Sequence, residues 1–391
     1  MSVLNILEEK LAETKKQGRF REFLNLERGV QDKPWATSHG HHGERRLNVW
    51  CSNDYLAMSH HPKVLLATTE AVNRVGLGTC GARSISGTSV YHSELETLLA
   101  SAYGKESALL FTTGFGANDA TLSTLCDAIP DLIVFSDELN HASMIYGIRY
   151  SKAEKKIFRH NDVAHLAELL QAADPARPKL IAFESLYSMD GDFAPLAQIV
   201  ALAEQYQALT YLDEIHSAGV YGERGLGYAE QLGLLDKITI IQGGFGKSYG
   251  AAGGYIAAPR SVVEAVRSWA PAFVFSTSSP APVVAAALAS FKYNLEHDTQ
   301  RKHLLAIVDH LKTGLRAAGI PLVSADSHIL PLRVGDPHRN KHISQVLLDE
   351  HDIYVQPVNA PTVPAGSERL RVTPTSAHSH ADVETFLDAL G

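Results

Sequence analysis

The sequence predicts an α/β protein with a mostly parallel sheet, and three observations support this fold class. Between residues 105 and 257, short apolar runs alternate with helical patterns. These runs are continuously apolar, which is typical of strands buried on both faces of a sheet. Polar or glycine-rich segments follow them, as expected where ligands bind beyond the carboxyl ends of parallel strands. We therefore expect functional residues to gather at one edge of this sheet.

The expected elements follow in order along the chain. Leucines at helical spacing near the start (Leu4, Leu7, Leu11) predict an amphipathic helix. Strands are predicted in "SALLFT", "DLIVFS", "KLIAFES", "ALTYLDE", "ITIIQGG" and "GGYIAA". An alanine-rich helix then precedes two more predicted strands, "HILPLRVGD" and "RLRVTP". We expect an N-terminal helical segment (1–47), a large α/β domain (48–280) and a smaller C-terminal α+β domain (281–391).

Composition narrows the class of protein. The chain has 391 residues, 45% of them hydrophobic, and a formal net charge of −8. This charge argues against a nucleic-acid partner, which would need a concentrated basic face. The three cysteines (Cys51, Cys80, Cys126) lack metal or redox spacing and suit a reducing compartment. No apolar stretch approaches the ~20 residues of a membrane span, and the start lacks a targeting pattern, so we expect a cytoplasmic protein that acts on small molecules without a metal.

One lysine stands out in the stretch "KITIIQGGFGKSYGAAGGYIA". Its "GKS" resembles the end of a phosphate-binding loop, but that motif needs glycine where the chain has Ile241. A second possibility is covalent catalysis, in which the amine of Lys247 forms a Schiff base and the glycines admit a flat cofactor. The third is a surface lysine in a glycine-rich turn. This stretch alone leaves the last two open.

Other polar residues follow the predicted strands and suit pyridoxal phosphate as the cofactor. Asp213 ends a strand, where its carboxylate could hold a ring nitrogen protonated. His216 and Ser188 could bond a phenolic oxygen, and His141 could stack on the ring. Each has an ordinary alternative: a loop cap or metal ligand for Asp213, turn residues for His216 and Ser188, and a helix N-terminal residue for His141.

A further loop, "TTGFGANDATLST", also follows a predicted strand. It places Gly114 and Phe115 just before a helix. Free N–H groups at a helix start suit a phosphate group. A single G-x-G is a weak signal, and only its position after a strand makes it useful.

With these residues in place, the chain from Gly18 to Pro374 resembles the α-oxoamine synthase family of pyridoxal-phosphate enzymes. Within that family it is most similar to the 5-aminolevulinate synthases. The matching stretches occur in order: "GRFREF", "VWCSNDYL", "GTCGARSISGTSVYHSELE", "ANDATLSTL", "SDELNHASMI", "FESLYSMDGDF", "LDEIHSAGVYG", "FGKSYGAAGGYIAA", "FSTSSPAP" and "YVQPVNAPTVPAGSERLRVTP".

The resemblance implies a fold-type I, aminotransferase-like architecture with a seven-stranded type of sheet. It implies that Lys247 holds pyridoxal phosphate and later moves the α-proton of glycine, with His141 as the second catalytic residue. Asp213 would face the ring nitrogen, and Ser188 and His216 would bond the phenolic oxygen. Further cofactor-binding positions would be Gly114, Phe115, Gly244, Ser276 and Thr277.

The resemblance also implies substrates and an assembly. Glycine would condense with succinyl-CoA, releasing coenzyme A and carbon dioxide. Asn53 and Arg371 would bind the glycine carboxylate, and Arg21 the distal succinyl carboxylate. The acyl-CoA would also meet Ser136, Lys155 and Thr362. Ser276 and Thr277 would reach the cofactor of a neighbouring subunit, which implies a homodimer with shared active sites.

The chain departs from the family at three positions. Gly244 replaces a threonine that holds the cofactor phosphate. Ala82 and Ser84 replace a threonine and an asparagine that help to read the acyl group, so a different acyl-CoA or another small amino acid is an alternative. A third possibility, a catalytically silent fold-type I subunit that only binds a partner, is disfavoured because Lys247, Asp213 and His141 are all present.

Overall fold

The computed structural model describes residues 3–20, 22–40 and 43–391. The chain forms two compact units: the first comprises residues 1–55, 188–192 and 302–391, and the second residues 56–187 and 193–301. The segment expected as a separate N-terminal part therefore shares a unit with the C-terminal residues. The alanine-rich helix α11 (Ala281–Glu296), which was expected to open the C-terminal domain, belongs to the second unit because it packs on α2 (Pro62–Val75) and α3 (Val90–Tyr103).

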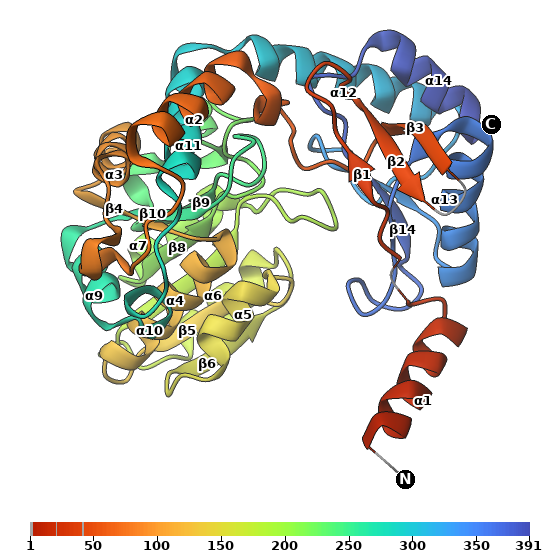
Figure 1. Cartoon of the computed structure of the whole chain (residues 1–391). Helices are drawn as coiled ribbons and strands as arrows, with labels where there is room; N and C mark the ends of the chain where they lie inside the picture. Colours follow the sequence, from red (N-terminus) through yellow and green to blue (C-terminus); the bar gives the residue numbers. More distant parts are fainter. Residues whose placement is uncertain (1–2, 21, 41–42) are drawn as a thin grey trace. The chain divides into compact units, whose positions relative to one another are not determined.

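A seven-stranded sheet forms the centre of the second unit (Figure 1). Five neighbouring strands run parallel to one another, and β10 is antiparallel to both of its neighbours. The prediction of a mostly parallel sheet is thus confirmed. In spatial order the strands are β4 (Ser107–Phe111), β10 (Gly254–Ala258), β9 (Ile240–Gly244), β8 (Leu209–Asp213), β7 (Lys179–Glu184), β5 (Ile133–Asp137) and β6 (Glu154–Phe158).

Six of these strands were predicted, and β6 was not. Its sequence, "EKKIF", carries three charged residues, and its side chains alternate between exposed and partly buried. This pattern follows from its position at the edge of the sheet, where it pairs only with β5. An edge strand lacks the continuous apolar run that identified the other strands.

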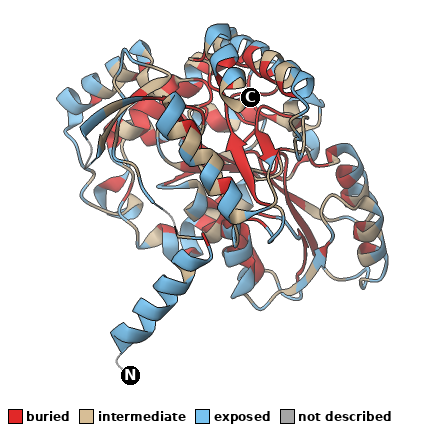
Figure 2. Cartoon of the chain, turned by 90° about the vertical axis from the view of Figure 1, so that its right-hand side faces the viewer, coloured by how far each residue is buried: buried red, intermediate tan, exposed pale blue. Residues whose placement is uncertain are grey.

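Helices bury both faces of this sheet, and its strands other than the edge strand β6 are almost entirely buried (Figure 2). One apolar cluster joins alternate strand residues to helices α4, α5, α9 and α10. The other cluster joins the intervening strand residues to α3, α6, α7 and α11. The bounds are α4 (Gly114–Ala128), α5 (Ala142–Arg149), α6 (Val163–Gln171), α7 (Leu196–Gln205), α8 (Tyr228–Gln231), α9 (Arg260–Trp269) and α10 (Pro271–Val274).

The first unit contains two smaller sheets packed with helices around its own core, which includes Trp50, Leu311, Val372 and Phe386. One sheet has the order β1-β2-β3-β12 and the other β11-β14-β13. The strands are β1 (Leu26–Glu27), β2 (Trp35–Gly40), β3 (Gly43–Val49), β11 (Leu330–Arg333), β12 (Ile353–Tyr354), β13 (Pro357–Val358) and β14 (Arg369–Val372). The helices are α12 (Thr299–Ala317), which starts in the second unit, α13 (Pro337–His351) and α14 (His380–Leu390).

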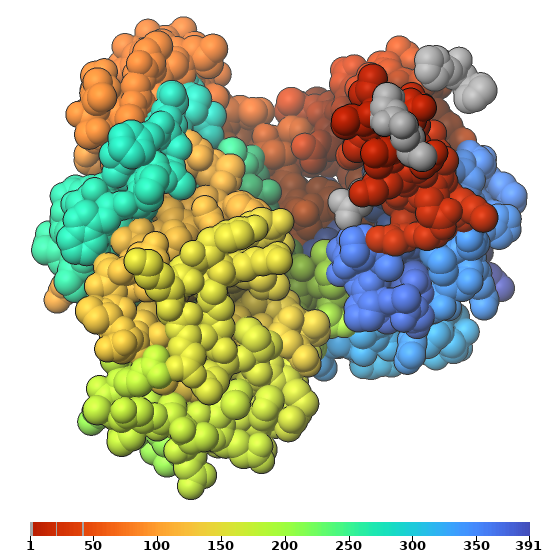
Figure 3. Space-filling view, turned by 90° about the horizontal axis from the view of Figure 1, so that it is seen from below, coloured from red at the N-terminus to blue at the C-terminus, as the bar shows by residue number. Residues whose placement is uncertain are grey.

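The N-terminal residues contact C-terminal segments of the same unit. The predicted first helix is present as α1 (Val3–Lys16), and all of its described side chains except Thr14 are exposed (Figure 2). Lys341 Nζ donates to Phe20 O at 2.9 Å, and Asn359 Nδ2 donates to Gly18 O at 3.2 Å. Figure 3 shows the red N-terminal residues against blue C-terminal ones. None of the helices in the described residues is both long and apolar enough to span a bilayer.

Candidate active site

Several predicted site residues of the second unit lie just beyond the carboxyl ends of its strands. His141 follows β5, His216 follows β8, and Lys247 follows β9, while Asp213 is the last residue of β8. Gly114 begins the helix after β4. Because β5, β8 and β9 are parallel, their carboxyl ends meet at one edge of the sheet. These residues therefore lie at one edge of the sheet, as we expected.

Lys247 lies in the glycine-rich turn after β9 and contacts His216. The turn is closed by Gly250 N, which donates to Lys247 O at 2.8 Å. Lys247 Nζ lies 2.5 Å from Nε2 of His216, whose ring is buried. The amine of Lys247 thus lies beside an imidazole at the edge of the sheet. Lys247 is therefore not an isolated surface lysine in a glycine-rich turn.

Asp213 is a buried carboxylate held by neutral donors. Its Oδ2 accepts from Asn118 Nδ2 at 2.7 Å, and its Oδ1 accepts from Ile215 N at 2.8 Å. Tyr211 OH donates to the Oδ1 of the same asparagine at 2.7 Å, which fixes the orientation of its amide. Since these donors carry no positive charge, the carboxylate keeps a charge that a cationic ligand group can neutralise.

His141 is linked to Asp213 through two side chains. Asn118 Nδ2 also donates to Ser143 Oγ at 3.0 Å, and Ser143 Oγ lies 2.7 Å from His141 Nδ1. The backbone N–H of Ser143 donates to the same ring nitrogen, so Nδ1 is an acceptor and the ring proton resides on Nε2. Burial lowers the pKa of His141, and the nearby Lys247 lowers it further, while Asp213 opposes this shift. The ring is therefore a neutral donor at Nε2.

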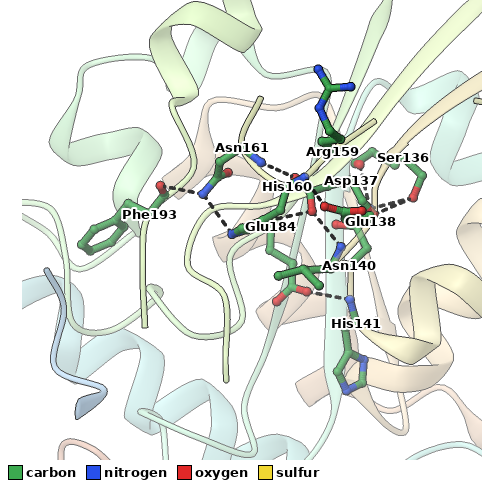
Figure 4. Close-up of polar contacts among 12 residues, drawn as sticks. Ser136, Asp137, Glu138, Asn140, His141, Arg159, His160, Asn161, Glu184 and Phe193 are labelled. Atoms are coloured by element: carbon green, nitrogen blue, oxygen red, sulfur yellow. Dashed lines mark hydrogen bonds and ion pairs between the residues drawn. The ribbon is translucent and has the colours of Figure 1, made fainter. Parts of the chain in front are cut away.

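Glu184 is a second buried carboxyl group at this edge, which the sequence analysis did not identify. It ends β7 beside Asp213, with which it pairs in register. Its Oε1 accepts from His141 N at 2.6 Å (Figure 4). Burial raises the pKa of Glu184 well above its usual range, and repulsion from Asp213 raises it further, while Lys247 lowers it. The protonated form of Glu184 is thus favoured by its surroundings, and its signal in the sequence was its position at the end of "IAFE".

Figure 4 also shows the polar network next to this site. Asp137 is buried; its Oδ1 lies 3.0 Å from His160 Nδ1, and its Oδ2 accepts from Asn161 N at 3.0 Å. Ser136 is buried as well, and its Oγ accepts from Asn140 Nδ2 at 2.9 Å. The hydroxyl of Ser136 thus contacts the loop after β5 through Asn140. The contact of Ser136 with coenzyme A stays a prediction.

Two glycines at this edge lie against the side chain of Ile215. A Cβ atom at Gly114 would be 2.5 Å from Ile215 Cδ1, and one at Gly244 would be 2.7 Å from the same atom. Gly114 starts α4, whose Thr113 cap accepts from Gly116 N at 2.9 Å. The first N–H groups of a helix suit an anion. Ile215 thus occupies the space that a side chain at position 244 would need.

Phe115 and His141 lie near one another with their rings perpendicular. Their centroids are 6.3 Å apart with an interplanar angle of 78°, and Phe115 is partly exposed on the first turn of α4.

Lys155 is exposed and donates through Nζ to Arg149 O at 2.6 Å. It therefore closes the end of α5 while its charge remains accessible to solvent.

In the first unit, the structure brings Asn53 and Arg371 together. Arg371 Nη1 donates to Asn53 Oδ1 at 3.0 Å, Nη2 donates to Tyr55 OH at 3.2 Å, and Nε donates to Ser188 O at 2.7 Å. All three acceptors are neutral, so the guanidinium retains a charge that suits a carboxylate ligand. Burial raises the pKa of the Tyr55 hydroxyl, although Arg371 lowers it, so that the hydroxyl remains protonated.

Other predicted substrate residues lie in the same two units. Thr362 lines a cavity of about 370 Å³ in the first unit, together with Arg19, Tyr354 and Asn359. Arg21 lies outside the described residues. Ser276 and Thr277 lie after α10 in the second unit, where Thr277 forms a β-bridge with Ala82. Ser84 is exposed two residues further along.

The described residues contain no group of three His, Cys, Asp or Glu side chains arranged to hold a metal ion. The three cysteines are free thiols. Burial raises the pKa of both Cys51 and Cys126 to about 11, which keeps these two thiols protonated and unreactive.

Comparisons with known proteins bear on this arrangement. The family model for aminotransferase class I and II matches residues 46–390. The chain belongs to this family. Within it, the chain belongs to the α-oxoamine synthases: it is 49% identical over 383 residues to 5-aminolevulinate synthase of Rhodobacter capsulatus, covering 96% of this chain and 92% of the relative. It is 50% identical over 374 residues to 5-aminolevulinate synthase of Rhizobium meliloti, covering 96% and 93%.

Solved structures agree with this family assignment. A structure of serine palmitoyltransferase (SPT) with a PLP internal aldimine matches with a TM-score of 0.93 and 32% identity, covering 100% of this chain and 97% of that chain. The enzyme of Sphingomonas wittichii matches with a TM-score of 0.91 and 31% identity over the same shares. The α-oxoamine synthase prediction and its fold-type I architecture are therefore confirmed.

Proposed function

We propose that this α-oxoamine synthase uses pyridoxal phosphate to condense glycine with succinyl-CoA, giving 5-aminolevulinate, coenzyme A and carbon dioxide. The observation that carries the proposal is the bonded series from Asp213 through Asn118 and Ser143 to His141 at the sheet edge that also holds Lys247. Near-complete coverage of 5-aminolevulinate synthases at 48–50% identity supports the choice of substrates.

The residues of the second unit fit the cofactor. Asp213, held only by neutral donors, would neutralise a protonated ring nitrogen. The neutral ring of His141 would stack on the cofactor ring, and the amine of Lys247 would hold the aldehyde. Gly114 and Phe115 at the start of α4, with the backbone of Gly244, would receive the phosphate. When bound, pyridoxal phosphate supplies an electron sink for charge that develops at the glycine α-carbon.

Lys247 and His141 would carry the proton chemistry. Lys247 Nζ would accept the α-proton of glycine and return a proton to the product. His216, 2.5 Å from that nitrogen, would orient the amine and, with Ser188, bond the phenolic oxygen of the cofactor. His141 bears its proton on Nε2 and would donate to the thioester oxygen as negative charge develops there.

The substrates would be bound by the remaining predicted residues. Arg371 and Asn53 would bind the glycine carboxylate, because the partners of the guanidinium among the described residues are neutral. Arg21 would pair with the succinyl carboxylate, and Ala82 and Ser84 would help to read the acyl group. Coenzyme A would contact the exposed Lys155, together with Thr362 and Ser136.

We also propose a cytoplasmic homodimer. Ser276 and Thr277 would reach the cofactor phosphate of the neighbouring subunit. Phe275, beside them, is 84% exposed, which suits a residue that another subunit covers. The free cysteines suit a reducing compartment.

A different acyl group is the second candidate. Ala82 and Ser84 are small, and Ser84 is exposed, so the loop that bears them leaves room for a longer chain. The test is release of coenzyme A with glycine across a panel of acyl-CoAs. We expect succinyl-CoA to give the highest kcat/KM, about tenfold above an uncharged acyl group of equal length, because a charge-assisted hydrogen bond contributes ~1.5 to 3 kcal/mol. A higher kcat/KM with a medium-chain acyl-CoA would establish the second candidate instead.

A further inference from the structure

Helix α3 contacts two segments to which the proposed function gives separate tasks. We call residues 79–88 the acyl loop, because they include Ala82 and Ser84. We call residues 276–278 the phosphate segment. Both segments and α3 belong to the second unit, so the contacts among them are defined within one compact body.

The acyl loop and the phosphate segment pair with each other through their backbones. Ala82 forms an antiparallel β-bridge with Thr277. Ser278 N donates to Gly81 O at 2.9 Å, and Thr79 Oγ1 donates to Ser278 O at 2.9 Å. A displacement of one segment would therefore break hydrogen bonds to the other, so the two behave as one structural piece.

His92 of α3 is hydrogen-bonded to the phosphate segment through Ser278. Its Nδ1 accepts from Ser89 N at 3.2 Å, so the ring proton lies on Nε2. Nε2 lies 2.9 Å from Ser278 Oγ, to which it therefore donates. The ring is buried, and burial lowers the pKa of His92 to about 4, with a further contribution from Arg83. This donor is consequently in place at neutral pH.

Glu96, one helical turn further along α3, fastens the acyl loop. Its two oxygens accept from Nη1 and Nη2 of Arg83 at 2.8 and 3.0 Å, a bidentate ion pair of which both side chains are largely buried. Leu110 N also donates to Glu96 Oε1 at 3.0 Å, which ties the carboxylate to β4. Arg83 separates Ala82 from Ser84 in the sequence, so its position sets where these two residues lie.

We propose that His92 and Glu96 are positioning residues for the acyl-CoA reaction, which hold the acyl loop and the phosphate segment in one fixed register on α3. This inference rests on the proposed function, since that function assigns the two segments to acyl group and cofactor. It predicts that acyl selectivity and cofactor affinity are coupled through α3. The residues assigned to glycine, Asn53 and Arg371, belong to the first unit and are not part of this arrangement.

The expected effect is therefore selective. Glu96→Gln removes the charge from the bidentate pair, and His92→Ala removes the donor to Ser278. In each variant we expect KM for succinyl-CoA to rise about tenfold, the magnitude of one lost charge-assisted or buried hydrogen bond. The dissociation constant of pyridoxal phosphate should rise severalfold, whereas KM for glycine should stay within about twofold.

The experiment compares these variants with three others. His92→Gln keeps a side-chain N–H near Ser278 and should recover at least half of the loss. Ser278→Ala removes the acceptor with little change of volume, and it tests the same contact if His92→Ala fails to fold. Glu94→Gln is the matched control, because Glu94 is exposed on the same helix. Thermal unfolding verifies folding, steady-state kinetics give both KM values, and fluorescence titration gives the affinity for pyridoxal phosphate.

The outcomes separate this inference from the proposed function. Equal changes in both KM values, or a loss of thermal stability alone, would overturn the positioning role. Unchanged cofactor affinity in both Glu96→Gln and Ser278→Ala would also overturn it, and this measurement needs no acyl-CoA. If the wild-type chain instead turns over no succinyl-CoA, the proposed function is wrong. The affinity of the variants for pyridoxal phosphate still tests whether α3 positions the phosphate segment.

Discussion

Glu184 and Asp213 occupy paired positions at the ends of the adjacent parallel strands β7 and β8, so two buried carboxyl groups lie side by side. Asp213 is held by neutral donors, and Glu184 accepts from the backbone of His141. Burial raises the pKa of Glu184 well above its usual range, and repulsion from Asp213 raises it further. The pair therefore places Asp213, which accepts from neutral donors, next to a carboxyl group whose pKa is raised.

Glu184→Gln should keep turnover within about threefold, because the amide is neutral like the protonated acid and retains an oxygen for His141 N. A carboxyl group with a raised folded-state pKa contributes stability that is full below its unfolded value, 4.5, and is lost as pH rises toward the folded value. The melting temperature of the variant should therefore fall less than that of the wild type as the pH rises above 4.5. An equal change of melting temperature with pH in the variant and the wild type would contradict the raised pKa of Glu184.

Lys247→Ala should fold and lose turnover. The side chain lies in a turn at the sheet edge and not in the apolar core, so we expect the melting temperature to fall by only a few degrees. Release of coenzyme A from succinyl-CoA and glycine should become undetectable. Lys292→Ala, an exposed lysine of α11, is the control and should behave as the wild type. Near-normal turnover without Lys247 would remove it from the proposed mechanism.

Asp213→Asn should fold and lose turnover by several orders of magnitude. Attraction between a carboxylate and a ring cation at ~3 Å in a partly shielded site amounts to several kcal/mol, and ~1.4 kcal/mol is tenfold in rate. The amide cannot hold the ring nitrogen protonated. Turnover numbers at saturating pyridoxal phosphate measure the effect, and a loss below tenfold would show that the aspartate is structural.

His378 should make the first unit sensitive to acid. His378 is buried against Trp50, with ring centroids 4.1 Å apart. Burial lowers the pKa of His378 from 6.5 to about 4, while Asp382 and the backbone hydrogen bonds of His378 have smaller, opposing effects. A depressed pKa means that this stability is present above pH 6.5 and is lost as pH falls through about 4. The loss is roughly 3 kcal/mol.

Unfolding by denaturant at several pH values measures this contribution. His378→Gln should lower stability at pH 7 and flatten its decline with acid. His351→Gln, an exposed histidine of α13, should leave the decline unchanged. An identical acid profile for wild type and His378→Gln would refute the assignment.

Gly244→Thr should destabilise the protein, because its Cβ would lie 2.7 Å from Ile215 Cδ1. Overpacking of this kind costs ~1 to 3 kcal/mol. Removing the obstructing atoms with Ile215→Ala should restore at least half of the lost melting temperature in the double variant. Thermal unfolding of both single variants and the double variant measures the coupling. Simple additivity of the two changes would show that Ile215 is not the reason for glycine at this position.

The local pattern of the sequence determined six of the seven strands of the main sheet. It also determined that Lys247, Asp213 and His141 follow or end such strands, because buried parallel strands are recognisable as continuous apolar runs. The matching motifs identified the family. Edge strand β6 escaped this reasoning, since three of its five residues are charged and it has no continuous apolar run.

The tertiary structure alone decided which residues meet. Asn118 meets Asp213 and Ser143, and Glu184 meets His141, only because helices and strands far apart in the sequence pack and pair in a particular arrangement. It likewise decided that the N-terminal residues join the C-terminal unit. Apolar periodicity reports whether a segment is buried, but register and packing partners depend on the complementary surfaces of distant segments.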